Sequence, residues 1–257
     1  MKRVIVFGDL PIATKIVEYL NGLNYIELIG VVTWPRKKRS IDAFNCDSLY
    51  EYAINNHIRI YSLEELANKF SINTLDFGLV VRFSKILKRD VISLFRKHIL
   101  NFHGGLLPEY SGLYSSCHEI LQMNEFGGGT LHFIKDERLD SGDIVKRCEF
   151  KILPTDTSES VFIKTQKVLY EGFCSVADDF FHERIISIPQ SQYINAGYKF
   201  QHFYKKDLEK ELQLDDSIKK AISVHARGFE FTDKERGYII YNGQKIYFTT
   251  KNLEGVV

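Results

Sequence analysis

The sequence has 257 residues, enough for one large domain with or without a small appendage. Apolar residues make up 44% of the chain and aromatic residues 13%, proportions typical of a globular core and not of a disordered protein. The 34 lysines and arginines nearly balance the 33 aspartates and glutamates, so the chain lacks the excess positive charge of a broad nucleic-acid-binding surface.

The cysteines and the amino terminus indicate the compartment. No C-x-x-C pair is present, which favours neither a zinc site nor a disulfide framework and predicts a reducing, cytoplasmic setting. The amino-terminal run MKRVIVFGDLP is too short for a signal peptide, and no window has the length and apolarity of a membrane span. We therefore expect a cytoplasmic protein with no metal, no membrane association and no nucleic-acid partner. The four cysteines are Cys46, Cys117, Cys148 and Cys174.

Apolar runs alternate with helix-like patterns along the first hundred residues. Ser62 and Glu65 form a capping box, S-x-x-E, at the start of one predicted helix. Such alternation predicts right-handed βαβ units and an α/β fold, a Rossmann-like, mostly parallel sheet with helices on both faces. The predicted strands are 3–8, 25–34, 58–62, 77–84 and 98–103, and the predicted helices are 11–22, 41–56, 62–70 and 85–97.

The second half of the chain changes character at Ile188. Before it we expect a helix over 114–125, paired strands over 130–137 and 143–153, and a long helix that Asp156 and Glu159 cap and that runs towards Glu183. After it, a polar, irregular stretch leads to a short helix near 216–229 and a hairpin over 237–250. The hairpin carries the turn signal Asn-Gly between alternating arms. We place the domain boundary near residue 190, with a catalytic domain over 1–190 and a small carboxy-terminal subdomain over 191–257.

The stretch NFHGGLLPEYSG, residues 101–112, places polar side chains at a strand end. Asn101 and His103 are two residues apart, so in an extended chain their side chains lie on the same side. Gly104 and Gly105 remove side chains where a ligand or another backbone must come close, and Pro108 stiffens the exit. Ligands of open α/β sheets bind outside the carboxyl ends of the strands. The tripeptide N-x-H alone is equally compatible with an ordinary structural histidine.

A second stretch, LDSGD, residues 139–143, supplies a carboxylate. Asp140 precedes Ser141 and Gly142, which predicts a turn at another strand end, from which Asp140 could orient His103. Asp143 and Asp136 are alternative carboxylates, and both fit local pairing better.

An amide, an imidazole and a carboxylate together suggest transfer of an acyl group. Asn101 could donate to a developing oxyanion, His103 could move protons and Asp140 could orient the imidazole. The nucleophile motif G-x-S-x-G is absent, and Cys117 falls on a predicted helix where packing is its expected role. A covalent intermediate is therefore not required.

The two stretches together resemble folate-dependent formyltransferases. NFHGGLLPEYSG resembles the segment N-x-H-x-x-L-L-P-x-Y-x-G of that family, and GGTLHFIKDERLDSGDIV resembles its segment that begins G-x-T-x-H and ends D-x-G-D-I. They occur in the family's order and at about its spacing, and the resemblance covers roughly residues 1–185. It implies 10-formyltetrahydrofolate as donor, a primary amine as acceptor, and Asn101, His103 and Asp140 as catalytic residues.

The resemblance also implies where the co-substrate and substrate bind. The pterin would lie between Phe83, Ser84, Ile86 and Leu87 on one side and Arg138 and Leu139 on the other. We expect the amine substrate near Arg82, Lys85, Gly104, Gly105, Tyr110 and Tyr114. The basic run 34–40 is an alternative phosphate site or simply a solvated loop. The aromatic side chains Phe203, Tyr204 and Phe229 could stack on a base or pack internally.

The tail, with FYKK, HARGF and the terminal hairpin, is similar to that of sugar N-formyltransferases, which act on nucleotide-linked amino sugars for surface polysaccharides such as lipopolysaccharide. Methionyl-tRNA formyltransferases carry a further nucleic-acid-binding barrel, for which this tail is too short. Glycinamide ribonucleotide transformylases have a glycine-rich first loop, whereas FGDLPIA has one glycine. Hydrolysis of the formyl donor, transfer to another small amine, and a catalytically silent binding module are the alternatives. The hairpin could also pair two copies as a homodimer. The base and the sugar carbon stay open.

Overall fold

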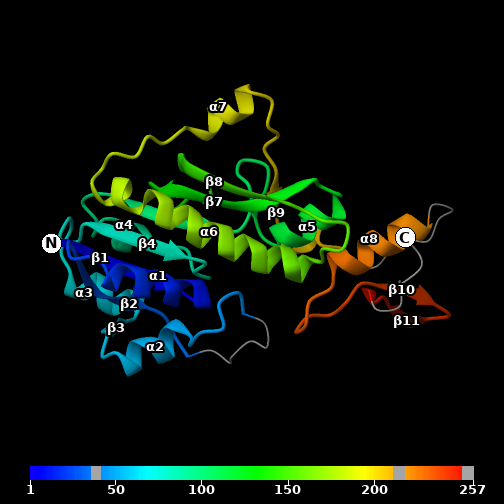
Figure 1. Ribbon diagram of the computed structural model, residues 1–257, viewed down its shortest axis with the longest axis horizontal. Coiled ribbons are helices and arrows are strands. Elements are labelled where there is room, and N and C mark those ends of the chain that lie inside the picture. Colours follow the sequence, from blue (N-terminus) through cyan, green and yellow to red (C-terminus); the bar gives the residue numbers. More distant parts are fainter. Residues whose placement is uncertain (36–41, 211–217, 251–257) are drawn as a thin grey trace.

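The computed structural model describes residues 1–35, 42–210 and 218–250, and the side chains of residues 218–220 are not described. Its centre is a seven-stranded sheet in the order β3-β2-β1-β4-β5-β7-β8 (Figure 1). The first five strands in this order are parallel, and β7 is antiparallel to both β5 and β8. The strands are β1 (Lys2–Gly8), β2 (Ile26–Val32), β3 (Ile60–Tyr61), β4 (Phe77–Val81), β5 (Ile99–His103), β7 (Phe126–Ile134) and β8 (Ile144–Lys151).

Helices cover both faces of the sheet, as the alternation of apolar runs predicts. Alternate residues of β1 point to opposite faces. Val4 and Val6 pack with buried side chains of α1 (Pro11–Asn21), α2 (Leu49–Asn55) and α6 (Ser158–Phe181). Ile5 and Phe7 pack with those of α3 (Leu63–Lys69) and α4 (Arg89–Ile92). The predicted α/β fold is therefore confirmed.

Three predicted helices are shorter than expected, and the one predicted over 114–125 ends at Leu121. The helix predicted over 41–56 is confined to α2, because the Asp42 carboxylate accepts the amides of Phe44 and Cys46 and keeps that stretch in a turn. The helix predicted over 85–97 is reduced to the single turn of α4. Its continuation instead bonds to the chain before β4, where the Leu75 amide donates to the carbonyl of Leu94.

The capping predictions have two outcomes. The capping box of Ser62 and Glu65 is present at the start of α3, as predicted. The cap predicted for the long helix is wrong, since Thr157 is the N-cap of α6 and its side chain accepts the Ser160 amide. Asp156 instead pairs with Lys164 at 2.6 Å.

The remaining elements of the chain are short. The helix α5 (Ser115–Leu121) lies between β6 (Ser111–Gly112) and β7. After α6 come α7 (Gln190–Asn195), β9 (His202–Phe203), the 3₁₀ helix η1 (Lys205–Asp207), α8 (Ile218–Gly228), β10 (Tyr238–Tyr241) and β11 (Gln244–Tyr247). In the predicted hairpin, Asn242 and Gly243 both have positive φ, 48° and 75°, as a two-residue turn of this kind requires.

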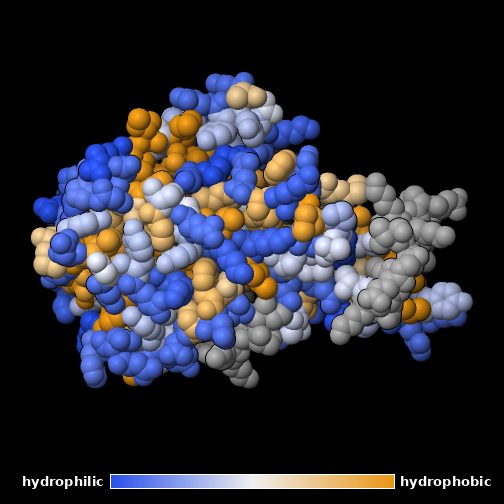
Figure 2. Space-filling view, in the orientation of Figure 1, coloured by the Kyte–Doolittle hydropathy of each residue, from blue (hydrophilic) through white to orange (hydrophobic). Residues whose placement is uncertain are grey.

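These last elements surround one end of the sheet. Figure 1 shows α7 above β8, and α8 with the β10–β11 hairpin at the end of the molecule opposite the amino terminus. Figure 2 shows a mainly hydrophilic face with small apolar areas, one of them beside α7. None of the helices in the described ranges has the length and apolarity to cross a bilayer.

Candidate functional site

The site begins where β5 ends. Asn101 lies opposite His132 of β7 in the antiparallel register, and the Asn101 Nδ2 and His132 Nε2 atoms are 2.8 Å apart. The other ring nitrogen of His132, Nδ1, is 3.0 Å from the Phe133 carbonyl oxygen. Since a carbonyl only accepts, we assign the proton of His132 to Nδ1, and Nε2 accepts from the Asn101 amide. This bond uses one of the two N–H groups of the amide, which therefore has a second N–H to offer.

His103 has an acceptor beside each ring nitrogen. Its Nε2 atom is 2.6 Å from the Tyr110 carbonyl oxygen, and its Nδ1 atom is 3.3 Å from Asp140 Oδ1. The side chain is only 6% exposed. The loop can approach this closely because Gly105 has no side chain, whose Cβ would lie 2.5 Å from the Tyr110 carbonyl oxygen.

Of the three candidate carboxylates, the structure places Asp140 beside His103. Its Oδ2 atom accepts the Gly112 amide at 2.8 Å, and its backbone lies in the left-handed region with φ 49°. Asp143 pairs with Lys135 at 2.5 Å, and Asp136 pairs with Arg138 at 2.7 Å. The turn predicted for residues 139–143 thus presents one carboxylate to the site.

The electrostatics of this pair follow from burial and proximity. Burial alone would raise the pKa of Asp140, but His103, His132 and the Gly112 amide lower it, and the net pKa lies well below the usual range. Burial lowers the pKa of His103 below its ordinary value, and Asp140 and the Tyr110 carbonyl offset part of that effect. At neutral pH the ring is therefore neutral, and Asp140 and the Tyr110 carbonyl are the groups that favour a proton that it takes up.

These residues line a cavity of about 1020 Å³. One wall, which we call the sheet-end wall, consists of the carboxyl ends of β4 and β5, the loop after β4 and the loop between β7 and β8. The exposed apolar side chains Ile86 and Leu139 are 45% and 52% exposed and both belong to this wall. Phe83 packs between Phe7 and Trp34, with ring centroids at 5.7 and 5.1 Å.

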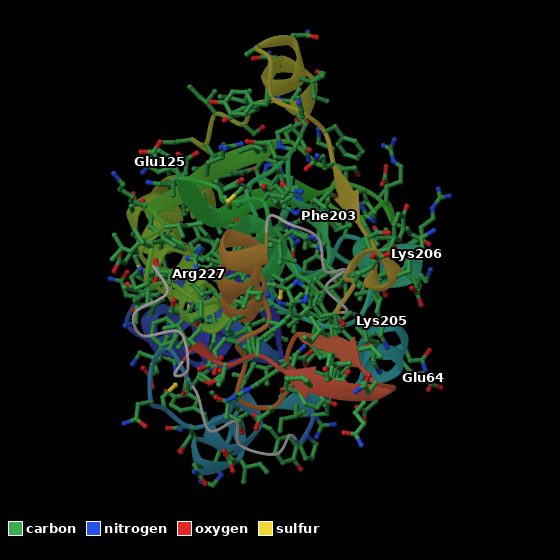
Figure 3. The ribbon with its side chains drawn as sticks, turned by 90° about the vertical axis from the view of Figure 1, so that its right-hand side faces the viewer. Glu64, Glu125, Phe203, Lys205, Lys206 and Arg227 are labelled. Carbon is green, nitrogen blue, oxygen red and sulfur yellow. The ribbon has the colours of Figure 1, made fainter. Side chains whose placement is uncertain are left out.

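The second wall, which we call the tail wall, comes from the start of α5 and from the chain from β9 onward. In Figure 3, which looks onto this end of the molecule, Phe203 lies between α7 and the hairpin, with Lys205 and Lys206 on the same side. Lys205 lines the cavity, whereas Lys206 does not. The basic and aromatic side chains of this wall are Tyr114, His202, Phe203, Tyr204, Lys205, Lys210, Phe229, Phe231 and Lys234.

The cavity gathers nearly all of the predicted site residues. Gly105 and Tyr110, expected to contact the substrate, do not line it, and their contact with the substrate stays a prediction. Gly105 packs under Tyr110, and the Tyr110 hydroxyl points into the protein and donates to Gln122 at 2.6 Å. The predicted residues that line the cavity are Arg82, Phe83, Ser84, Lys85, Ile86, Leu87, Asn101, His103, Gly104, Tyr114, Arg138, Leu139 and Asp140.

The predicted substrate-binding cations Arg82 and Lys85 each pack against a neighbour at the cavity. Gly104 lines the cavity, but the space beside it holds the Arg82 guanidinium, whose Nη1 atom lies 2.0 Å from where a Gly104 Cβ would be. The Lys85 ammonium lies 4.7 Å from the centre of the Trp34 ring. The rest of the basic run 34–40, from residue 36 on, lies outside the described residues. Cys117 is 7% exposed and burial raises the pKa of its thiol, in agreement with a packed role.

Sequence reasoning missed two features of the site. His132 is 1% exposed and bonded to Asn101, and its place in the segment G-x-T-x-H was the available signal. The tail wall had no comparable signal, because its residues come from several short elements that meet only in the folded chain.

The family model that matches this sequence and two curated relatives are all formyltransferases. The sequence matches the formyl transferase family over residues 2–177. A methionyl-tRNA formyltransferase of Elusimicrobium minutum is 26% identical over 213 residues, which are 80% of this chain and 62% of that protein. One from Clostridioides difficile is 28% identical over 156 residues, 58% of this chain and 50% of that protein. The chain thus spans less than two thirds of these two relatives.

Solved structures of sugar N-formyltransferases share the fold over nearly the whole chain. An N-formyltransferase of Helicobacter canadensis, in complex with folinic acid and dTDP-3-aminofucose, has a TM-score of 0.76 and 23% identity, covering 96% of this chain and 86% of that one. A 4-N formyltransferase of Francisella tularensis has a TM-score of 0.73 and 19% identity, covering 96% of each chain. Because the family match extends over more than half of the sequence, this chain belongs to the formyl transferase family.

Proposed function

We propose that this protein transfers a formyl group from 10-formyltetrahydrofolate to the amine of a nucleotide-diphosphate-linked amino sugar. The observation that carries the proposal is the cluster of Asn101, His103 and Asp140 at the edge of one cavity, bonded as an acyl-transfer site requires. The cavity is large enough for two substrates to meet, since typical ligand sites span about 300–1,000 Å³.

The sheet-end wall fits the folate. Ile86 and Leu139 offer exposed apolar surface to a flat ring, and Leu87 closes the pocket from the core at 3% exposure. The loop that carries Phe83 and Ser84 is fixed because the Ser84 amide donates to Asp9 Oδ2 at 2.7 Å. A rigid apolar slot with a few backbone polar groups is the usual form of a heterocycle site. These contacts support the co-substrate assignment made from the resemblance.

The tail wall fits the acceptor. Lys205, Lys210 and Lys234 bring positive charge to it, and Glu235, bonded to Lys210 at 2.8 Å, is its partly compensating carboxylate. Ammonium groups are suitable partners for a diphosphate, and exposed aromatic rings such as Tyr204, 55% exposed, can stack on a base. A nucleotide-linked sugar could thus lie along this wall with its amine directed at the strand ends.

The chemistry follows from the three residues and the bound donor. The folate supplies an activated one-carbon acyl group. The second N–H of Asn101 donates to the acyl oxygen as negative charge develops there. As the amine–formyl bond forms and the N10–formyl bond breaks, neutral His103 accepts the proton that the amine loses and passes it to N10 of the leaving tetrahydrofolate. While the ring is protonated, the imidazolium donates to Asp140 and to the Tyr110 carbonyl. His132 keeps the Asn101 amide in the orientation that this donation requires.

Hydrolysis of the formyl donor is the main competing function, because water in place of the amine would use the same residues. The test is to incubate the protein with 10-formyltetrahydrofolate and a panel of nucleotide-linked 3-amino and 4-amino sugars, and to detect the formylated sugar by mass spectrometry. We expect one or more acceptors to gain a formyl group, and His103→Asn to lose this activity while staying folded. Release of formate without an acceptor, or near-normal transfer by His103→Asn, would refute the proposal.

Further parts of the function are predictions from the sequence. A role in surface polysaccharide biosynthesis, a cytoplasmic location and pairing of two copies through the β10–β11 hairpin follow from the resemblance, the cysteine usage and the hairpin pattern. Ile240 and Ile246 on the hairpin are 43% and 46% exposed, and they lie on opposite faces of it, because Ile246 pairs with Ile239. Size-exclusion chromatography with light scattering tests whether two copies pair.

A further inference from the structure

The chain between α6 and β9 passes along the outer edge of the sheet and reaches the site. Ile188 forms an isolated antiparallel bridge with Ile144 at the start of β8, with both N–H to carbonyl distances at 2.8 Å. Pro189 follows, and Gln190 begins α7. The bridge thus places Gln190 beside the loop that carries Asp140.

Gln190 is bonded to the backbone of that loop. Its Nε2 atom donates to the Asp140 carbonyl at 2.6 Å and to the Gly142 carbonyl at 2.9 Å. The residue is 8% exposed, so these bonds are largely shielded from water. The two carbonyls flank Ser141, and the amide therefore fixes the turn on which Asp140 adopts its left-handed backbone conformation.

The helix that carries Gln190 is itself anchored. Tyr193 and Tyr198 contact the Arg147 guanidinium, with its carbon 5.5 and 4.8 Å from their ring centres. Arg147 in turn bonds both oxygens of Glu109, at 2.7 and 2.9 Å, in the loop that follows His103. One segment, residues 188–198, therefore contacts the Asp140 loop directly and the His103 loop through Arg147.

We propose that Gln190 is a positioning residue that keeps Asp140 in its contact with His103. The proposal rests on the formyl transfer proposed above, in which Asp140 stabilises the imidazolium. The Gly112 amide and, at 3.5 Å, the Ser111 hydroxyl hold the carboxylate of Asp140, and Gln190 holds its backbone. Without Gln190 the two carbonyls lose their donor, the turn relaxes, and the carboxylate moves away from Nδ1.

The test compares Gln190→Leu with Gln192→Leu, a matched control on the same helix whose side chain is exposed. The charged and titratable groups that act on His103 are Asp140, His132 and Arg82. Of these three groups, only Asp140 favours the imidazolium, and its movement away from His103 removes that effect. We therefore expect the pKa of His103, followed by NMR of its ring nitrogens, to fall in Gln190→Leu and not in Gln192→Leu.

Kinetics give the second readout. With an acceptor identified by the screen above, Gln190→Leu should lower kcat by roughly 100-fold with little change in either KM, because a misplaced catalytic group costs about that much. A merely structural role would lower the melting temperature and the active fraction, but would leave the His103 pKa unchanged. If Gln190→Leu does not fold, Gln190→Glu keeps the length while removing the donor at neutral pH, and the same outcomes apply.

An unchanged His103 pKa in the Gln190 variant, or equal losses in the Gln192 control, would overturn the positioning role. Failure of the formyl transfer proposal would appear differently, as a wild-type protein that formylates none of the sugars. The NMR comparison needs no acceptor, so it tests Gln190 in either case.

Discussion

The two walls of the cavity are built in opposite ways. On the sheet-end wall the polar catalytic groups are buried and bonded to one another, with His103 and Asp140 only 6% and 10% exposed. On the tail wall the cations and aromatic rings lie on loops and on short elements such as the two-residue strand β9 and the single turn η1, and several are exposed. A parallel sheet fixes the ends of its strands firmly, whereas short surface elements can vary in sequence at small cost. We infer that the first wall serves the chemistry and the second selects the acceptor.

The largest effect should follow from a change in the sheet-end wall. Asp140→Asn removes the charge that stabilises the imidazolium of His103, and we expect kcat to fall by about 10³-fold, within the range for general acid–base groups. Folate binding, measured by calorimetry, should stay nearly unchanged. Asp143→Asn is the control, because Asp143 pairs with Lys135 outside the cluster. Equal losses of kcat in the two variants would show that Asp140 has no specific role in catalysis.

The two walls also differ in how far the sequence predicted them. The strand end at His103 and the turn at Asp140 were predicted because spacing along one strand and a short turn motif are local patterns. His132 was missed since its contact with Asn101 depends on the antiparallel register of β5 and β7, and no local pattern states that register. The reduction of α4 to one turn has the same origin, because the competing partner of its chain lies near Leu75. The tail wall depends wholly on such distant contacts.

A change in the tail wall should affect binding and not chemistry. Lys205→Ala combined with Lys234→Ala should raise the KM for the nucleotide sugar by about 10- to 100-fold, since a hydrogen bond to a charged group contributes about 1.5–3 kcal/mol. The kcat at saturation should change little. Lys206→Ala is the matched control, because this neighbour of Lys205 does not line the cavity. A loss of kcat with unchanged KM would place these lysines in the chemistry and break the distinction between the walls.

The pH dependence tests the state of His103. Because burial keeps the pKa of His103 below its ordinary value, the ring is neutral at pH 7 and becomes cationic only in more acid solution. If neutral His103 accepts the proton, kcat/KM should be constant near pH 7 and fall about tenfold per pH unit below that lowered pKa. In Asp140→Asn the fall should begin at lower pH. A rate that rises as the solution is acidified from pH 7 would contradict this assignment.

The smallest expected effect concerns α5, which contributes to the tail wall. Its Cys117 faces the cavity, whereas Glu119 is fully buried beneath β7, where the Gly128 amide is 3.4 Å from Oε1. Burial raises the pKa of Glu119 well above its usual range. The folded chain therefore keeps this proton at pH values where the unfolded chain has released it, and stability falls as pH rises above the ordinary value of the carboxyl.

Glu119→Gln has no proton to lose, so its advantage over the wild type should grow from pH 5 to pH 8. In a chain of this size about 1 kcal/mol corresponds to about 2–4 °C in melting temperature, which is the gain we expect at pH 8. Activity should not change, because Glu119 faces the sheet and not the cavity. Glu125→Gln is the control, since Glu125 is 66% exposed and its ion pair with the equally exposed Lys151 is long at 3.6 Å. A gain that is independent of pH, or one shared by Glu125→Gln, would show that the buried charge of Glu119 is not its source.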